Sequence, residues 1–302
     1  MPSWEEQKLR IFFSVDIVGS TEYKTRRRES HEKWWVFYQS FFEDFQTQFA
    51  GHLSQAQENY SKLTEPPSLW KLLGDEMLYT AVIKTPADAA ALTKAFYRTL
   101  FEYDKTCEEQ GQLRVKGTGW TAGFPIRNAE IRLKELFGKA TPGPDYIGQD
   151  IDIGFRLGHT ARAGRMTVSM DLAEVLTQDR GKNFDFYHVG WENLKGVFAN
   201  HPYPVIWITE DDKPRMLPWE DFQCPFTKSF KEDRKLEKND LIGLFKDIRR
   251  ELRDLNLIAP YFNKDDMPEE HKEIWKAWKK EERLERKTDV LQGQGDDPLG
   301  TD

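Results

Sequence analysis

The 302-residue sequence has few cysteines and no long apolar segment. Its two cysteines, Cys107 and Cys224, form no Cys-x-x-Cys pair, which argues against a thiolate zinc site and is typical of the reducing cytoplasm. No apolar run reaches the roughly 18 residues that a membrane-spanning helix needs. The N-terminal stretch MPSWEEQKLR lacks the apolar core of a signal peptide. We therefore expect a cytoplasmic protein that does not associate with a membrane.

An excess of basic residues is also missing. The chain has 44 basic and 51 acidic residues and a net charge of -7, which argues against a general nucleic-acid-binding protein. A small anionic substrate remains possible, because local basic residues and metal ions can offset the overall charge. Hydrophobic residues make up 38% of the chain and aromatic residues 13%, enough for a well-packed core in one large domain or two ordinary ones.

Hydrophobic periodicity and capping signals predict the elements of the first half of the chain. We expect a strand at residues 9–15, a helix at 30–49, a loop at 51–67, strands at 69–73 and 77–82, a helix from Thr85 to Gly111 and a strand at 113–124. This order of strand, helix, hairpin, helix and strand is typical of a ferredoxin-like or palm-type layout. The sequence thus predicts an α/β (α+β) fold.

The second half is expected to complete the same domain. Its predicted elements are a short helix at 127–138, a turn-rich loop at 140–148, a helix at 149–162, a strand at 165–169, a short helix at 171–179 and strands at 184–189 and 204–209. The composition changes after residue 210, where a proline-containing linker precedes charged amphipathic helices at 235–255 and 269–286 and a disordered tail at 293–302. We expect a catalytic domain at 1–210 and a helical extension at 211–302 that covers the core or a dimer surface.

Two aspartates stand out because each follows an apolar strand. Asp16 ends the apolar run of IFFSVDIVGST, and Asp75 lies between the two apolar runs of LWKLLGDEMLYT. A buried type of strand seldom carries an acid unless something pairs with it, so two such acids at strand ends suggest a shared cation. Gly19, Ser20 and Thr21 would offer free backbone N–H groups at a helix start, which suit phosphate. Together these features describe two-metal phosphoryl chemistry. For either segment alone, a helix N-cap or a turn residue is the commoner explanation of an aspartate.

Four blocks carry a resemblance to a known family. FSVDIVGST, KLLGDE, DYIGQDIDIGFRL and LKGV occur in this order between about residues 9 and 210. This arrangement resembles the class III nucleotidyl cyclases, the adenylyl and guanylyl cyclase family. The aromatic-rich first helix and the DIDIGFRL block are most similar to the bacterial pyrimidine cyclases of Pycsar antiphage systems. The resemblance implies a class III cyclase catalytic domain followed by a helical extension.

The resemblance also implies a reaction and a metal site. The family's ribose 3′-oxygen attacks the α-phosphate of a nucleoside triphosphate and releases pyrophosphate. Asp16 and Asp75 match the two metal-binding aspartates, which would hold two divalent cations, Mg²⁺ or Mn²⁺. The backbone carbonyl of Ile17 would be a further ligand, and residues 19–21 would contact the terminal phosphates.

Three further positions match catalytic or phosphate-binding residues of the family. Arg156 matches the arginine that stabilises charge on the α-phosphate in the transition state, although a lone helical arginine is more often in a surface salt bridge. Lys195 resembles a polyphosphate-contacting lysine, with a solvated turn lysine as the alternative. Asp152 stands where the family usually has a ribose-orienting asparagine. Because it lies four residues before Arg156, it could simply pair with that arginine.

Lys71 and Asp145 match the positions that recognise the base in adenylyl cyclases. A donor beside an acceptor fits adenine, cytosine and uracil, so hydrogen bonding does not choose among them. Bulky neighbours such as Trp120 and Phe155 could reduce the size of the pocket. The preference for a pyrimidine, with UTP ahead of CTP, rests on the resemblance alone.

The family builds its site across two subunits, so one chain with both residue sets implies a head-to-tail homodimer. The leading hypothesis is a uridylate cyclase that makes cUMP as an antiphage second messenger, read by a separate effector. The alternatives are an adenylyl cyclase that makes cAMP, and a degenerate cyclase that only binds nucleotide or a partner.

Overall fold

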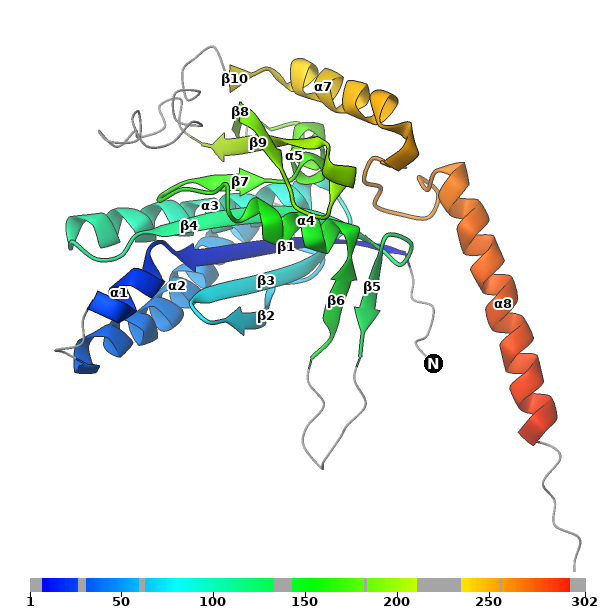
Figure 1. The fold of residues 1–302 in the computed structure, drawn as a ribbon, viewed down its shortest axis with the longest axis horizontal. Helices are drawn as coiled ribbons and strands as arrows, with labels where there is room; N and C mark the ends of the chain where they lie inside the picture. The colour runs from blue at the N-terminus through cyan, green and yellow to red at the C-terminus, as the bar shows by residue number, and fades with distance from the viewer. Residues whose placement is uncertain are drawn as a thin grey trace, which may run out of the picture.

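The computed structural model describes residues 7–26, 31–59, 63–132, 143–181, 184–210, 235–255 and 257–293. Eight strands form one sheet in the order β10-β8-β9-β7-β4-β1-β3-β2 (Figure 1). These strands are β1 Lys8–Ile17, β2 Ser68–Leu73, β3 Glu76–Ile83, β4 Val115–Phe124, β7 Met166–Val168, β8 Asp185–Asn193, β9 Pro202–Thr209 and β10 Lys235–Leu236. β5 Asn128–Ile131 and β6 Asp145–Gly148 form a separate two-stranded sheet. The helices are α1 Ser20–Arg26, α2 His31–Asn59, α3 Pro86–Glu109, α4 Gln149–Leu157, α5 Met170–Gln178, α7 Lys238–Glu251 and α8 Glu269–Gly293.

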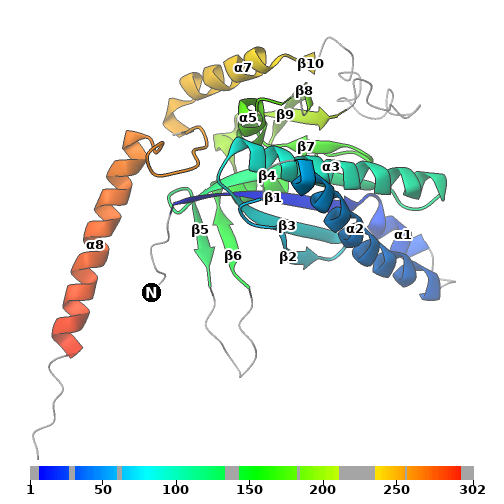
Figure 2. The same cartoon turned by 180° about the vertical axis from the view of Figure 1, so that it is seen from behind.

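β1 is an interior strand, third from the β2 edge, and pairs antiparallel with β3 on one side and β4 on the other. Successive side chains of a strand point to opposite faces. Phe13 therefore packs against Phe96 of α3, on the face that α2 and α3 cover (Figure 2). Phe12 points to the opposite face and stacks on Trp120 of β4, close to α4. The predicted layout of strand, helix, hairpin, helix and strand is confirmed.

The start of α3 shows how local sequence determines an element. Thr85 is the N-cap, its side chain accepts a hydrogen bond from the backbone N–H of Asp88, and the Asp88 side chain completes a capping box. Pro86 occupies the first turn, where its missing N–H costs nothing. Gly111, with φ of +64°, follows the end of the helix. The predicted bounds of this helix are confirmed.

Several sequence-based expectations are wrong. The first long helix, α2, does not end before residue 51 but runs to Asn59, because Ala56 continues its buried face. The helix expected at 149–162 ends at Leu157, and the one expected at 235–255 begins at Lys238, after the strand β10.

The segments expected as a helix at 127–138 and a loop at 140–148 contain two strands. Asn128–Ile131 and Asp145–Gly148 pair as antiparallel strands. The connection between them is too long for a tight-turn signal, so no local pattern predicts the pairing. The remainder of these two segments, residues 133–142, lies outside the described part.

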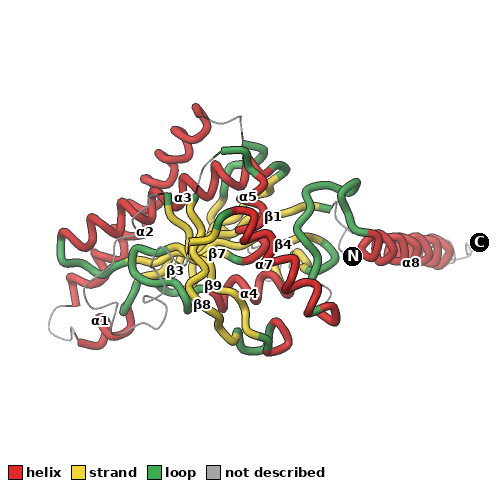
Figure 3. Tube along the Cα trace, turned by 90° about the horizontal axis from the view of Figure 1, so that it is seen from above, coloured by secondary structure: helices red, strands yellow, loops and turns green. Residues whose placement is uncertain are grey.

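The C-terminal segment adds to the sheet and to its core. β10 pairs with β8, and α7 buries Leu241, Phe245 and Ile248 in the main hydrophobic cluster. The expectation that this segment covers the core is thus confirmed for α7. By contrast, α8 extends away from the sheet (Figure 3). The expected linker at 211–234 and most of the expected disordered tail, residues 294–302, lie outside the described residues. Within the described ranges, no helix combines the length and apolarity needed to cross a bilayer.

Candidate active site

The two aspartates predicted as metal ligands lie at the same end of the sheet. Asp16 is the penultimate residue of β1, opposite Glu76 of β3 and Lys116 of β4. Asp75 lies in the tight turn between β2 and β3, directly before Glu76. Gly74 makes this turn possible with a φ of +68°, which a residue without a Cβ adopts readily. The structure therefore brings the two carboxylates together.

Burial and the charge of Lys116 act in opposite directions on the pKa of Asp16. Burial raises the pKa of Asp16, Lys116 opposes that rise, and the charge of Asp75 adds to it. The Lys116 Nζ lies 3.2 Å from Asp16 Oδ2, and the Lys24 Nζ lies 3.4 Å from Asp75 Oδ1. Each aspartate thus faces a lysine.

Glu76 is a third acid of this site that the sequence interpretation missed. Burial raises its pKa, and the nearby charges of Asp16 and Asp75 add to the rise. Its carboxylate accepts a hydrogen bond from the Ser14 hydroxyl on β1. The sequence shows only that Glu76 follows Asp75, whereas its place opposite Asp16 depends on the register of β3 with β1.

The donor set fits Mg²⁺ or Mn²⁺ bound together with a substrate. In the described ranges, no three His, Cys, Asp or Glu side chains gather into a metal cage. Mg²⁺, however, is commonly held by one or two carboxylates, with substrate phosphates and waters completing the shell. Asp16, Asp75 and the Ile17 carbonyl could provide such a partial shell. Their role as metal ligands stays a prediction.

The Gly-Ser-Thr turn lies beside this end of β1. Gly19 adopts a φ of +77° and precedes α1, which begins at Ser20. The Ser20 side chain is 6% exposed, whereas Gly19 and Thr21 are exposed. Any phosphate contact at this turn would therefore involve the backbone rather than the Ser20 hydroxyl.

The base-recognition pair is also brought together. Lys71 of β2 and Asp145 of β6 form an ion pair with 2.6 Å between Nζ and Oδ1. Burial of Asp145 works against its ionisation, but Lys71 and the backbone N–H of Tyr146 lower its pKa overall. The Lys71 ammonium also lies 4.3 Å from the centre of the Trp70 ring. The pair is thus a fixed donor and acceptor on an aromatic support.

Aromatic side chains fill the space beside this pair. Trp70 meets Phe12 at 5.3 Å and Phe155 of α4 at 6.0 Å between ring centres. Trp120 is fully buried and lies 5.8 Å from Phe155. Tyr146 packs edge-on against Trp70 at 5.2 Å. The cluster thus lies to one side of the pair, whose side chains are 28% (Lys71) and 51% (Asp145) exposed.

Asp152, Arg156 and Lys195 form a second group. Arg156 lies 3.7 Å from the Asp152 carboxylate, so the ion pair expected from their spacing is confirmed. The Arg156 Nε donates to the backbone carbonyl of Lys195, whose side chain is exposed. Gly196, next to it, lies against the Arg156 guanidinium. The helix end of α4 and the turn after β8 thus bring a guanidinium and an ammonium to one surface.

The metal-site group and the Arg156 group have no direct contact within one chain in the described part of the structure. Neither Asp16 nor Asp75 forms an ion pair or hydrogen bond with Arg156 or Lys195. One side chain connects the two regions. Lys116, which pairs with Asp16, also donates to the Gly158 carbonyl just after α4, at 3.1 Å.

Comparisons with known proteins find a likeness in structure only. No protein-family model matches the chain, and no curated protein matches it either. The catalytic core of a rhodopsin-guanylyl cyclase with converted specificity, solved with ATPαS, is 15% identical at a TM-score of 0.50 and covers 70% of this chain and 100% of its own. The adenylyl cyclase CyaB from P. aeruginosa is 15% identical at a TM-score of 0.48, covering 70% of this chain and 98% of its own.

These structures are too distant in sequence for the roles of their residues to be transferred to this chain. The likeness concerns the fold alone. The chain therefore has the mixed α/β fold of class III nucleotidyl cyclase catalytic domains.

Proposed function

We propose that this protein is a nucleotidyl cyclase that converts a pyrimidine nucleoside triphosphate, UTP in preference to CTP, to the 3′,5′-cyclic nucleotide and pyrophosphate. The observation that carries the proposal is the convergence of Asp16 and Asp75 at one end of the sheet in a class III cyclase fold. We place the catalytic unit within residues 1–210, in the cytoplasm.

The metal-site residues bind and orient the triphosphate. Two divalent cations at Asp16, Asp75 and the Ile17 carbonyl would neutralise the triphosphate and lower the pKa of the ribose 3′-hydroxyl. Lys24 and Lys116 keep these carboxylates in place while the site is free of metal. Backbone N–H groups of residues 19–21 are placed to contact the terminal phosphates.

Arg156 stabilises the charge that develops on the α-phosphate, because a planar guanidinium offers paired donors to phosphate oxygens. Its contact with the Lys195 carbonyl supports this role, since it holds the guanidinium beside the lysine that would contact the polyphosphate. Asp152 forms an ion pair with Arg156. Its role in the proposal is to position this guanidinium near the ribose.

The choice of a pyrimidine is supported by the aromatic cluster around Lys71 and Asp145. The pair itself could recognise uracil, cytosine or adenine. Trp70, Trp120 and Phe155 occupy the adjoining space, which favours a single-ring base. ATP remains the second candidate, because the 2.6 Å ion pair presents the donor and acceptor that adenine needs.

A head-to-tail homodimer is part of the proposal. The separation of the metal-site group from the Arg156 group supports it, because each chain would complete the other's site. The outer strand β2 lies at an edge of the described sheet and exposes the apolar side chains of Leu69, Leu72 and Leu73, which a second copy could cover. From the sequence resemblance, we further propose that the product is an antiphage messenger read by a separate effector.

The deciding experiment is incubation of the purified protein with ATP, GTP, CTP or UTP and Mn²⁺, followed by mass spectrometry. We expect cyclic UMP, with less cyclic CMP. Cyclic AMP or GMP as the main product would overturn the pyrimidine assignment and leave the cyclase assignment standing. The absence of a cyclic product with every nucleotide would favour a binding-only homologue.

The matched control is Asp75→Asn, which keeps the size of the side chain and removes its charge. Asp75 lies in a turn and supports no part of the core, so we expect an unchanged melting temperature and loss of turnover. Unchanged turnover in this variant would rule out the two-metal assignment.

A further inference from the structure

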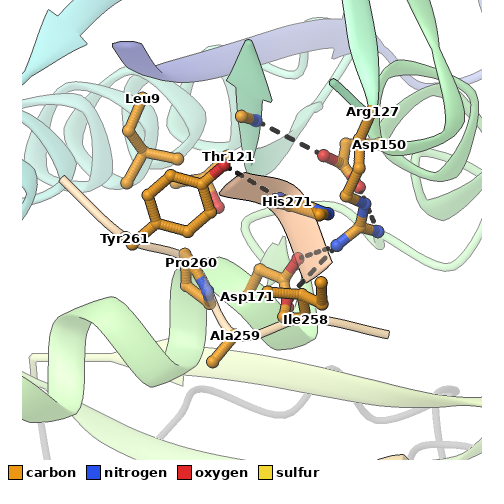
Figure 4. A pocket seen from close by; sticks show the side chains of 11 residues that line it. Leu9, Thr121, Arg127, Asp150, Asp171, Ile258, Ala259, Pro260, Tyr261 and His271 are labelled. Atoms are coloured by element: carbon orange, nitrogen blue, oxygen red, sulfur yellow. Dashed lines mark hydrogen bonds and ion pairs between the residues drawn. The ribbon is translucent and has the colours of Figure 1, made fainter. Parts of the chain in front are cut away.

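Arg127 lies where helices α4 and α5 meet the C-terminal extension (Figure 4). Its Nη2 is 2.5 Å from the Asp150 carboxylate of α4, and its Nη1 is 3.6 Å from that of Asp171 on α5. Nη1 also donates to the backbone carbonyl of Ile258 at 3.2 Å. One guanidinium therefore contacts two helices of the catalytic domain and the extension together.

The extension is anchored around this arginine. Leu257 and Met267 are 8% and 2% exposed, and the Tyr261 hydroxyl lies 2.9 Å from Nδ1 of the buried His271. Gln7, just before β1, donates to the Tyr261 carbonyl at 3.2 Å. The segment between α7 and α8 is thus fixed against the sheet by both packing and hydrogen bonds.

A second arginine ties α7 to the same group. Arg249 lies 3.1 Å from Asp171 and 2.5 Å from Glu174, both on α5. Asp171 is therefore shared by Arg127 and Arg249. A displacement of α7 or of the segment after it would disturb the ion pairs of Arg127.

On the other side, Asp150 fixes the start of α4. Its backbone N–H donates to the Asn128 side chain at 3.1 Å, and its carboxylate accepts from the Asn128 amide at 2.7 Å. α4 has nine residues and carries both Asp152 and Arg156. A helix this short moves as a unit, so the position of Asp150 affects that of Arg156.

A small cavity remains at the junction. It has a volume of about 20 Å³, enough for about one water molecule, and lies between the sheet and the segment of Ile258 to Tyr261. The Thr121 hydroxyl on its wall is buried and has no hydrogen-bond partner among the described residues. The packing beside Arg127 is therefore incomplete at this one place.

We infer that Arg127 is a positioning residue through which the C-terminal extension controls α4. When the extension is seated, Arg127 is shielded from water and its pairing with Asp150 is strong. When the extension is displaced, water reaches the guanidinium and α4 loses its fixed start. The consequence for catalysis rests on the role of Arg156 in the proposed function, whereas the mechanical coupling does not.

The coupling is tested by hydrogen–deuterium exchange of the full chain, with Leu257→Ala as the variant. This change removes an anchor of the extension and touches no catalytic residue. Leu92→Ala, an equal truncation in the core at α3, is the control. We expect exchange in residues 149–157 to become at least about tenfold faster in Leu257→Ala and not in the control. Equal exchange in this segment in both variants would overturn the inference.

Arg127→Lys provides the second measurement. It keeps the buried charge but lacks the planar fork of two terminal nitrogens, one of which contacts Asp150 and the other Asp171 and Ile258. We expect faster exchange in residues 149–157 and a kcat lowered by about tenfold or more with little change in KM. If the wild-type protein makes no cyclic product, the proposed function fails while the exchange measurement still decides the coupling. Slow exchange in α4 in both Leu257→Ala and Arg127→Lys would show that the extension has only a structural role.

Discussion

Lys116 is a single side chain that contacts both the metal-site group and the end of α4. It lies across from Asp16 in the strand register and contacts both that carboxylate and the carbonyl that follows α4. While no cation is bound, the ammonium is the main counter-charge of Asp16. A divalent cation at Asp16 would be repelled by the same ammonium.

We expect Lys116→Gln to bind Mn²⁺ more tightly than the wild-type protein. Removal of a positive charge a few ångströms from the ligand should increase the affinity by roughly tenfold or more. Isothermal titration calorimetry with Mn²⁺ alone would measure it. Lys94→Gln, which removes a lysine paired with Glu210 far from the metal site, controls for net charge. An equal gain in both variants, or weaker binding in Lys116→Gln, would contradict the expectation.

His271 at the start of α8 predicts a dependence of stability on pH. Burial lowers its pKa from the ordinary value of 6.5, and the positive charge of Arg127 lowers it further. As the pH falls below 6.5, His271 is protonated in the unfolded chain before it is protonated in the folded chain. The stability contributed by neutral His271 is therefore present above pH 6.5 and is lost as the pH falls.

We expect the wild-type protein to lose more stability than His271→Gln between about pH 7.5 and pH 5.5. Because a single proton is involved, the difference is at most about 1.4 kcal/mol for each pH unit. Urea unfolding at both pH values measures it, and the variant accounts for the other titrating groups. Parallel pH profiles of the two proteins would show that His271 has the same pKa in the folded and unfolded states.

Among the elements, α4 is positioned by a close approach to β4. A Cβ added to Gly154 would lie 2.2 Å from the Trp120 ring, so only glycine allows the helix to pack at this distance. The ring is fully buried and has no space into which to move. The distance between α4 and the sheet, and hence the position of Arg156, depends on this glycine.

Gly154→Ala should therefore destabilise the protein by about 1–3 kcal/mol, although alanine is the better helix former. Gly243→Ala in α7 is the matched control, because a Cβ there meets nothing within 4 Å. The control should gain about 0.4–1 kcal/mol. Urea unfolding of both variants tests the pair, and a stability gain in Gly154→Ala would exclude the tight packing.

For the molecule as a whole, the decisive property is whether two chains share each site. Asp75→Asn and Arg156→Ala each remove one of the two residue groups and should be inactive alone. In a head-to-tail dimer, mixing them forms heterodimers that have one intact site and one doubly altered site. Equal mixing with full exchange should restore about a quarter of wild-type activity. No recovery after verified subunit exchange would favour a site formed within one chain.

The sequence by itself determined the elements whose signals are local. The strand ending at Asp16, the hairpin turn at Gly74 and Asp75 and the capped helix after Thr85 follow from apolar runs, turn residues and caps. The spacing of Asp152 and Arg156 likewise determined their ion pair, because four residues place two side chains on one helical face. These features depend only on residues that are close together in the sequence.

Only the tertiary structure decided the contacts between distant segments. The pairing of β5 with β6, the placement of Glu76 beside Asp16 and the contact of Lys116 with both Asp16 and the end of α4 depend on strand register. Arg127 was expected at the start of a helix, yet it joins α4, α5 and the extension. Such contacts depend on how the elements pack against one another. The local periodicity of the sequence does not predict that packing geometry.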